Sequence, residues 1–303
     1  MNQQDPTFTM GVAEWGMLLA LALLWGGSFF FNALAVRDLA PLMVVAARVT
    51  IAAIILGMVV RIIGLSWPAP AIWPTFLIMG VLNNVVPFTL IVWGQTHIAS
   101  GLAAILNATT PLFTAVAAHL LTRDEKLTKA KIVGIGLGLS GVVVMLGADL
   151  FSGTGQVGPA QLAVLGAAIS YALAGVFGRR FRRLGINAIV TASGQVTGSA
   201  LVLLPIALIF AMPVHVPSLP TLAAMAGLGI FSTALAYVLF FRILSTAGAT
   251  NVMLVTLLAP VVSVTLGILV LGESLQPRHA WGVALIALSL AIMDGRLFRF
   301  IRR

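Results

Sequence analysis

The residues best placed to bind a small molecule stand just before two prolines, in two stretches of the chain that resemble each other. The stretches cover residues 101–145 and 250–293, and their polar residues and prolines are Asn107, Thr110 and Pro111, then Asn251, Thr256 and Pro260. A proline inside a helix removes a backbone donor and leaves the carbonyl one turn earlier free. Amide, hydroxyl and free carbonyl groups recognise a ligand by hydrogen bonds, so we predict a substrate site here with the two prolines as hinges. The alternative is that the side chains only hydrogen-bond neighbouring helices and the prolines only kink them.

Amide and aromatic side chains in other apolar stretches extend this predicted site. Asn83 and Asn84 precede a third proline, Pro87, which we predict as a further hinge. Aromatic residues near the middle of apolar stretches are Trp25, Tyr171 and Tyr237. An indole or phenol offers a flat apolar face and one hydrogen bond, which suits an aromatic or delocalised-cation ligand. Packing in the core is the competing interpretation.

Trp93 and Arg48 stand apart from this group. Trp93 lies near the end of an apolar stretch, where membrane proteins concentrate tryptophan, and gating of the site is its alternative role. Arg48 is the one strong charge inside an apolar stretch, and a guanidinium there must pair, reach the surface or meet an anionic group. We predict a structural contact to backbone carbonyls or to Asp38, in preference to a bond with a substrate carboxylate.

The sequence contains no motif typical of a catalytic or metal-binding site. The sequence has no cysteine, no glycine-rich phosphate loop and no His-Glu metalloprotease motif, and its four histidines show no ligand spacing. We therefore predict no catalytic residue, no metal, no cofactor and no enzyme activity. All eight acidic residues fall at the ends of apolar stretches or in loops, so none is predicted at the bilayer centre, where proton-coupled carriers usually keep a carboxylate. This favours facilitated diffusion or exchange.

The elements that must hold these residues are membrane helices. Apolar residues make up 60% of the 303 residues and charged residues 8%, which no water-soluble globule combines. A span needs roughly 20 apolar residues to cross the hydrocarbon. Ten stretches qualify, at 13–35, 41–63, 71–94, 98–121, 130–149, 160–178, 187–211, 219–243, 249–271 and 277–295. They lack the alternation of a membrane β-barrel, so the predicted fold is an all-α polytopic membrane protein.

Positive charge sets the predicted orientation, because Lys and Arg stay on the cytoplasmic side of short loops. Of the 17 Lys and Arg residues, all but Arg37, Arg48 and Arg278 fall on the side that holds the N-terminus. Both termini are therefore predicted to be cytoplasmic. The same topology explains the net charge of +9, which gives no support to nucleic-acid binding.

Each of the two similar stretches closes a half that contains five predicted spans. Because five is odd, the second half enters the bilayer upside down, which is the pattern of an inverted-repeat transporter. We predict a first five-helix repeat at 1–150 and a second, inverted one at 151–303, so a monomer is sufficient. The glutamates of the two stretches are predicted to cap helices or to pair with nearby cations: Glu125 and Glu273, with Lys129, Lys131 or Arg278.

Several motifs of the sequence match one transporter family. They are Trp25 to Phe29, Pro41 and Arg48, then Pro111 to Glu125, Leu127, Thr128 and Gly134, and in the second half Pro260, Leu271 to Glu273, Leu275 and Gly282. With them the chain resembles the ten-span EamA type of the drug/metabolite transporter (DMT) superfamily over nearly its whole length, although Ser170 to Leu173 replaces the Trp-Gly-Gly motif in the second half. The carboxylate-poor interior is similar to that of exporters of aromatic amino acids and methyl viologen. The resemblance implies a central cavity lined by spans one to four and six to nine, with spans five and ten peripheral.

The predicted function is a secondary transporter of the inner membrane that exports amino acids, aromatic or otherwise apolar, and related amphiphilic metabolites or drugs by alternating access. Its partners are then the lipid bilayer and a small-molecule substrate. Three alternatives stay open: a proton-coupled multidrug efflux antiporter, a channel or lipid scramblase, and a membrane scaffold that transports nothing.

Overall fold

The chain folds as a bundle of membrane-length helices. The computed structural model describes residues 10–147, 155–213 and 215–294, and the regular structure in these ranges is helical throughout. In this part of the chain, eight helical segments are long and apolar enough to cross a membrane, and two further apolar helices, Val255–Leu271 and Pro277–Met293, are shorter. The chain is thus a multi-pass membrane protein. The predicted ends at 149 and 295 lie outside the described residues.

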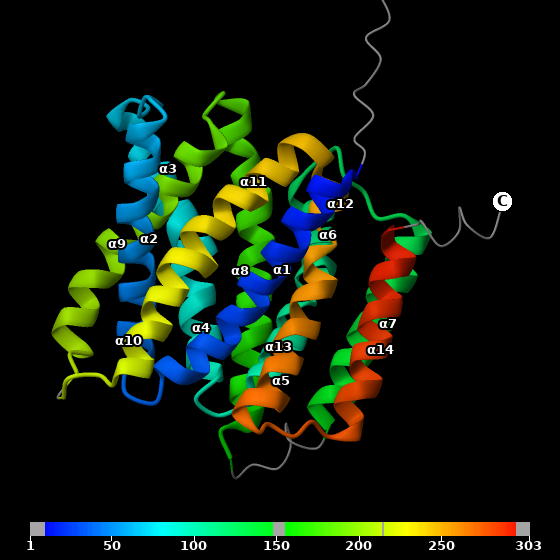
Figure 1. Cartoon of the computed structure of the whole chain (residues 1–303). Coiled ribbons are helices and arrows are strands. Elements are labelled where there is room, and N and C mark those ends of the chain that lie inside the picture. The colour runs from blue at the N-terminus through cyan, green and yellow to red at the C-terminus, as the bar shows by residue number, and fades with distance from the viewer. Residues whose placement is uncertain (1–9, 148–154, 214, 295–303) are drawn as a thin grey trace, which may run out of the picture.

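The first half of the chain forms helices α1 to α7 (Figure 1). Their bounds are α1 Val12–Ala35, α2 Pro41–Ile62, α3 Trp73–Gly80, α4 Val86–Gly94, α5 Ser100–Asn107, α6 Thr110–Leu121 and α7 Lys129–Leu146. A short 3-10 turn, η1 (Pro70–Ile72), precedes α3, and a π-helical segment, η2 (Val81–Val85), joins α3 to α4. Proline stands in the first turn of α2, α4 and α6, and in α2 its missing N–H has no intrahelical acceptor to lose.

The second half forms helices α8 to α14. Their bounds are α8 Val157–Arg183, α9 Ala188–Phe210, α10 Leu219–Ala226, α11 Ala236–Ala247, α12 Ala249–Val252, α13 Val255–Leu271 and α14 Pro277–Asp294. A second π-helical segment, η4 (Gly227–Leu235), joins α10 to α11. Gly272 ends α13 with a φ of 69°, a left-handed conformation that glycine adopts without a steric penalty.

Two of the predicted spans are broken beside their polar residues, and the role of their prolines as hinges stays a prediction. The span at 98–121 breaks between Asn107 and Thr110, so Pro111 stands in the first turn of α6 and not inside a continuous helix. The Asn107 carbonyl, four residues before Pro111, accepts a hydrogen bond from Thr110 Oγ1 in place of a backbone N–H. Pro260 does lie inside α13, whereas the break of that span comes earlier, between α12 and α13.

Helices α7 and α14 pack side by side along one edge of the bundle (Figure 1). Glycine allows the close approach, since a Cβ atom on Gly141 would lie 2.9 Å from the carbonyl oxygen of Gly282. Ser289 of α14 also donates a hydrogen bond of 2.5 Å to the carbonyl oxygen of Gly134. The place of this pair at the edge agrees with the peripheral position that the family resemblance implied for spans five and ten.

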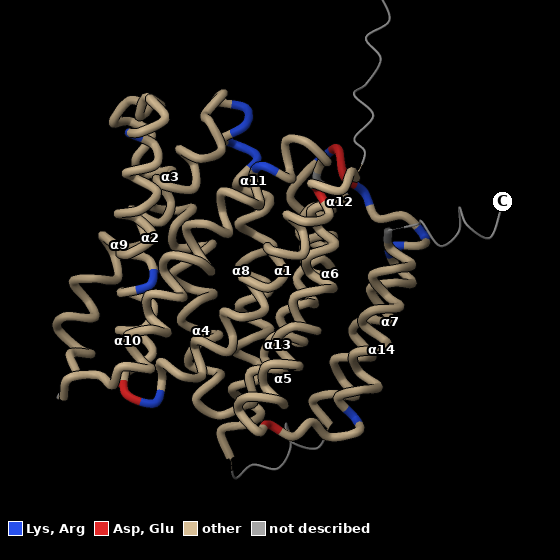
Figure 2. The backbone as a smooth tube through the Cα atoms, viewed as in Figure 1, with Lys and Arg blue, Asp and Glu red and all other residues tan. Residues whose placement is uncertain are grey.

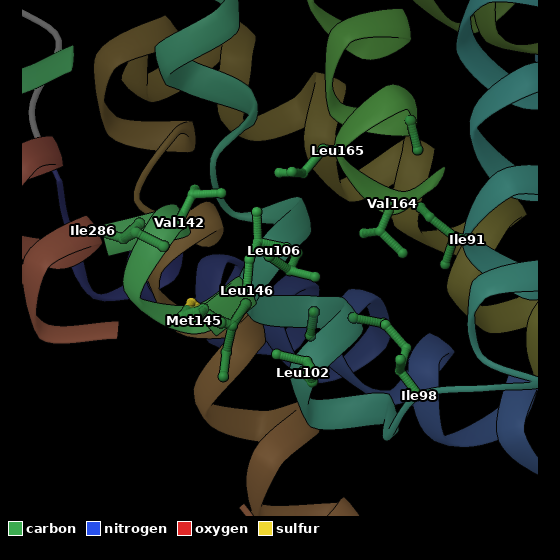
Figure 3. Packing of buried hydrophobic residues seen from close by; sticks show 14 of the residues in the cluster. Ile91, Ile98, Leu102, Leu106, Val142, Met145, Leu146, Val164, Leu165 and Ile286 are labelled. Carbon is green, nitrogen blue, oxygen red and sulfur yellow. The ribbon is translucent and has the colours of Figure 1, made fainter. Parts of the chain in front are cut away.

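The largest apolar cluster ties this edge to the rest of the bundle. Its buried side chains come mostly from α4, α5, α7, α8 and α14, with Phe29 of α1 and Leu112 of α6. Figure 3 shows among them Ile91, Leu106, Val142, Val164 and Ile286. Each of these side chains is removed from lipid and water, and burial of apolar groups at close packing holds helices in one arrangement. The cluster thereby fixes α4 and α8 beside the polar residues of the interior.

Charge is unevenly shared between the two ends of the bundle. Figure 2 shows most of the described Lys and Arg residues at the end where α7 begins and α8 finishes, and few at the opposite end. The two cations predicted at the opposite end are Arg37, which follows α1, and Arg278, in the first turn of α14. The four basic residues at 296–303 lie outside the described part of the chain. We call the basic end the Lys/Arg-rich end.

Candidate functional site

Five polar side chains from three spans hydrogen-bond one another inside the bundle. We call them the amide–phenol cluster: Asn83 and Asn84 of η2, Gln195 and Ser199 of α9, and Tyr237 of α11. Asn83 Nδ2 lies 3.1 Å from Gln195 Oε1 and 3.0 Å from the hydroxyl oxygen of Tyr237. The Tyr237 hydroxyl donates to Asn84 Oδ1 at 2.9 Å, and Asn84 Nδ2 donates to Ser199 Oγ at 3.0 Å. The cluster joins residues more than a hundred positions apart in the sequence.

Two π-helical segments bring this cluster together. In an α-helix the ring of Pro87 would clash with the carbonyl group of Asn83, and proline has no N–H to donate to that carbonyl. The wider turn of η2 accommodates both the ring and the missing hydrogen bond. In η4 the close neighbour is α2, because a Cβ atom on Gly229 would lie 2.5 Å from the Cβ of Ile51. Single π-helical turns occur often at functional sites. Here one such segment supplies two cluster residues and the other leads directly into Tyr237.

Arg48 of α2 lies next to the amide–phenol cluster and is only 5% exposed. Its Nε donates a hydrogen bond of 2.8 Å to Thr233 Oγ1, and its guanidinium carbon lies 3.8 Å from the centre of the Phe88 ring. Thr233 donates in turn to the carbonyl oxygen of Leu228 at 2.8 Å, which fixes the hydroxyl within η4. Arg48 is therefore held by one hydroxyl and one aromatic face.

Asp38 is not the partner of Arg48, and that prediction is wrong. Its carboxylate instead accepts hydrogen bonds from the backbone N–H of Ser218 at 2.8 Å and from Thr221 Oγ1 at 2.7 Å, at the start of α10. A carboxylate that accepts such bonds is stabilised in its charged form. Hydrogen bonds from Ser218, and then from Thr221, accordingly hold the pKa of the Asp38 carboxyl below its usual value.

Three of the four polar residues that flank the repeated prolines bond to nearby backbone carbonyls. The donors and acceptors are Thr110 Oγ1 to the Asn107 carbonyl (2.7 Å), Asn251 Nδ2 to the Ala247 carbonyl (2.8 Å) and Thr256 Oγ1 to the Met253 carbonyl (2.7 Å). The helix breaks supply the Asn107 and Met253 carbonyls, and the end of α11 supplies that of Ala247. The fourth residue, Asn107, has a buried Oδ1 with no hydrogen-bond partner among the described residues. The structure places these residues outside the amide–phenol cluster, and their contact with substrate stays a prediction.

The predicted aromatic residues lie in three different surroundings. Trp25 packs against Phe240 of α11, with ring centres 5.5 Å apart. Tyr171 of α8 faces the Phe88 ring that also contacts Arg48, at 6.5 Å between centres. Trp93 lines an apolar groove of about 320 Å³ between α2, α4 and the end of α9. Of the three, only Tyr171 lies beside the polar interior.

The glutamates of the two similar stretches have the structural roles expected, with different partners. Glu273 accepts hydrogen bonds from Ser100 N at 2.7 Å, Ser100 Oγ at 2.9 Å and Gly101 N at 3.2 Å, so it caps α5 as predicted. Glu125 forms an ion pair with Arg179 of α8, which corrects its predicted pairing with Lys129 or Lys131. Within the described ranges, no group of three His, Asp or Glu side chains could hold a metal ion.

Three residues of the site were absent from the predicted set: Gln195, Ser199 and Thr233. Gln195 and Ser199 are four residues apart in α9, which places them on one face, and each follows a glycine that meets α3. That spacing was a usable signal for Gln195 and Ser199. For Thr233 the sequence offers none, because its role depends on the π turn that directs its hydroxyl to Leu228.

Comparison with protein families finds one match that covers both halves of the chain. The model of the EamA-like transporter family matches residues 14–147 and again residues 158–293. A solved crystal structure that is 21% identical has a TM-score of 0.66 and covers 95% of this chain and 99% of its own. That likeness concerns the fold.

Curated relatives of similar length are membrane transporters. The uncharacterized inner membrane transporter YedA of Escherichia coli K12 is 28% identical over 289 residues, 93% of this chain and 92% of its own. The S-adenosylmethionine/S-adenosylhomocysteine transporter of Chlamydia trachomatis serovar L2 is 29% identical over 297 residues, 92% of this chain and 88% of its own. The uncharacterized transporter YoaV of Bacillus subtilis is 25% identical over 290 residues, 94% and 97% of the two chains.

Proposed function

This chain belongs to the EamA-like transporter family, and we propose that it carries small amphiphilic molecules across the membrane with the amide–phenol cluster as its substrate site. The family and its relatives are transporters and not enzymes. The observation that carries the proposal is the set of hydrogen bonds among Asn83, Asn84 and Tyr237 inside membrane-spanning segments. Burial of polar groups in a membrane span costs free energy, so such groups are usually found where they hydrogen-bond one another or line a transport pathway.

The proposed architecture is ten spans in two inverted repeats, at 1–150 and 151–303, with both termini in the cytoplasm. The double match of the family model and the concentration of Lys and Arg at one end of the bundle support it. The relative YedA is named as an inner membrane transporter, which supports the same location for this chain. One chain holds both repeats, so a monomer suffices.

The proposed cycle is alternating access, in which the two halves expose the cluster to either side in turn. In the structure the cluster residues bond to one another, so a substrate must exchange these bonds for its own when it enters. The absence of a carboxylate among the described groups of the cluster favours exchange or facilitated diffusion over proton coupling.

The proposed substrates are amino acids, aromatic or otherwise apolar, and related amphiphilic metabolites, and the proposed net direction is export. One relative is named for S-adenosylmethionine, a derivative of an apolar amino acid, which fits this class. Aromatic faces beside the cluster, at Tyr171 and Phe88, offer a surface for an apolar side chain.

Counterflow in proteoliposomes tests the proposal. Vesicles preloaded with one unlabelled amino acid or quaternary amine should accumulate the labelled compound with saturation. The Gln195→Leu variant should raise KM for the transported compound, while Asn107→Leu, outside the cluster, should change it less than the cluster variant does. Flux without saturation indicates a channel or scramblase, strict dependence on a pH gradient indicates a proton-coupled antiporter, and no flux with any compound refutes transport of this class.

A further inference from the structure

Arg48 has no acidic partner in the described part of the structure. The acidic side chains placed there contact other residues. Glu14 accepts a hydrogen bond from Gly11, Asp38 from Ser218 and Thr221, and Glu273 from Ser100. Asp124 and Glu125 both pair with Arg179. A guanidinium carries five N–H donors. For Arg48, only Nε makes a hydrogen bond within the described residues, to Thr233.

A buried cation without a charged partner is stabilised when an anion binds to it. Burial of an unpaired charge in a low-dielectric interior is strongly unfavourable, and a residue 5% exposed in a membrane span has little water to offset that cost. The Phe88 face supplies a weak electrostatic attraction and cannot accept the four N–H groups of the two terminal nitrogens. The planar fork of those nitrogens matches the two oxygens of a carboxylate.

The position of Arg48 relative to the amide–phenol cluster defines the kind of molecule that fits. Thr233, which holds Arg48, precedes Tyr237 by four residues, and Phe88, which covers it, follows Asn84 by four. Residues four apart lie on one face of a helix, about 5–6 Å from each other. Arg48 and the cluster are therefore neighbours along both spans, which places a cation beside amide and phenol oxygens, the two kinds of partner that a zwitterion needs.

We propose that Arg48 binds the carboxylate of the transported substrate, with Thr233 orienting its Nε and the amide and phenol oxygens of the cluster receiving the substrate ammonium group. This inference rests on the proposed function and makes it more specific: the substrates are zwitterions with a free carboxylate, such as α-amino acids. Decarboxylated amines and quaternary cations bind poorly because they leave the Arg48 charge unpaired.

Matched pairs of compounds test this on the wild-type protein. Counterflow is measured with phenylalanine, leucine and methionine, each beside its amide, in which an uncharged carboxamide replaces the carboxylate. We expect KM for each transported acid to be at least about tenfold below that of its amide, the difference expected for a charge-assisted bidentate bond. Equal KM values for acid and amide, or transport of amines alone, overturn the role of Arg48 and leave the transporter function standing.

Two variants of Arg48 separate binding from structure. Arg48→Gln should raise KM for the acid at least about tenfold and leave KM for the amide nearly unchanged, while Arg48→Lys, which keeps the charge and loses the fork, falls between them. Arg61→Gln, an exposed position on the same helix, is the matched control and should change neither value. An equal loss of acid and amide transport in Arg48→Gln at normal abundance refutes carboxylate recognition. Absence of saturable counterflow of every compound in wild-type protein refutes the proposed function itself.

Discussion

At the scale of residues, the amide–phenol cluster is held together through the hydroxyl of Tyr237. Tyr237 both accepts from Asn83 and donates to Asn84, so its hydroxyl links the two amides. In a low-dielectric interior a partly satisfied polar network is costly, whereas a complete one holds a defined geometry. A substrate with both donor and acceptor groups can replace these bonds one for one, and an apolar molecule cannot.

The Tyr237 hydroxyl can be tested against the only other tyrosine hydroxyl of the chain. Tyr237→Phe leaves Asn84 Oδ1, on a residue 0% exposed, without its donor, and an unpaired buried acceptor costs about 1–3 kcal/mol. We expect a lower thermal unfolding temperature in detergent and a raised KM in counterflow. Tyr171→Phe removes a hydroxyl that makes no hydrogen bond within the described residues, so it serves as the control. Equal effects of the two substitutions would contradict a specific role for Tyr237.

Asp38 gives a prediction for the pH dependence of stability. Because the pKa of its carboxyl is lowered in the folded protein by bonds from Ser218 and Thr221, the folded state binds the proton less tightly than the unfolded state. The resulting stabilisation is present above the unfolded pKa and is lost as the pH falls through the lower folded pKa. Asp38→Asn should therefore lower the unfolding temperature at neutral pH and approach wild-type behaviour in acid. A wild-type advantage that stays constant with pH would exclude this linkage.

Several residues of the site could be predicted from the sequence, but the residues to which they hydrogen-bond could not. Asn83, Asn84 and Tyr237 were predicted because polar groups in apolar stretches are conspicuous, and the structure brings all three together. The partners were not predictable in the same way, since Tyr237 and Asn83 are 154 residues apart. Polar side chains next to a helix break, such as Thr110, can instead bond the carbonyls that the break releases, and hydrophobic patterning does not distinguish these outcomes.

At the scale of elements, helix position could be predicted and helix interruption could not. Apolar length marked every membrane segment, because crossing the hydrocarbon requires a minimum run of apolar residues. Proline was an ambiguous signal: Pro87 follows a π turn, Pro111 begins a helix and Pro260 lies inside one. The π turn of η4 has no proline signal at all and depends on packing against α2, where Gly229 meets Ile51.

The α7–α14 pair supplies a prediction about packing with a control in the same helix. Gly141→Leu places side-chain atoms against the Gly282 backbone, where a Cβ atom would already lie 2.9 Å from the carbonyl oxygen. Overpacking of this kind costs typically about 1–3 kcal/mol, so thermal unfolding in detergent should shift downward. Gly136→Leu, at a position where a Cβ atom meets nothing within 4 Å, should leave unfolding unchanged. If both variants behave alike, the contact between α7 and α14 does not support the fold.

At the scale of the whole molecule, the orientation predicted from charge can be measured directly because the chain has no cysteine. Single cysteines replace two exposed loop residues, Thr128 before α7 and Ser274 after α13. With the Lys/Arg-rich end in the cytoplasm, a membrane-impermeant thiol reagent should label Ser274→Cys in intact cells. It should label Thr128→Cys only after permeabilisation. The reverse pattern would place both described ends of the bundle on the opposite sides and would contradict the charge rule for this chain.

In the proposed alternating-access cycle, the ends of α5 and α13 that lie away from the Lys/Arg-rich end separate, and a disulfide between these two helices tests this. These ends meet where Glu273 caps α5, and a Cβ atom on Gly101 would lie 3.7 Å from the Cβ of Val264, close to the mean of about 3.8 Å in disulfides. The close contact of that Cβ with Val264 Cγ2 disappears when valine is also replaced. The Cβ would also lie 3.3 Å from Val264 Cα, so Gly101→Cys with Val264→Cys should cross-link after a local shift of a few tenths of an ångström. Oxidation should stop counterflow and a reductant should restore it, while each single cysteine stays active. Undiminished flux through fully cross-linked protein would mean that substrate passes without this movement, and the transport cycle would then depend on other helices.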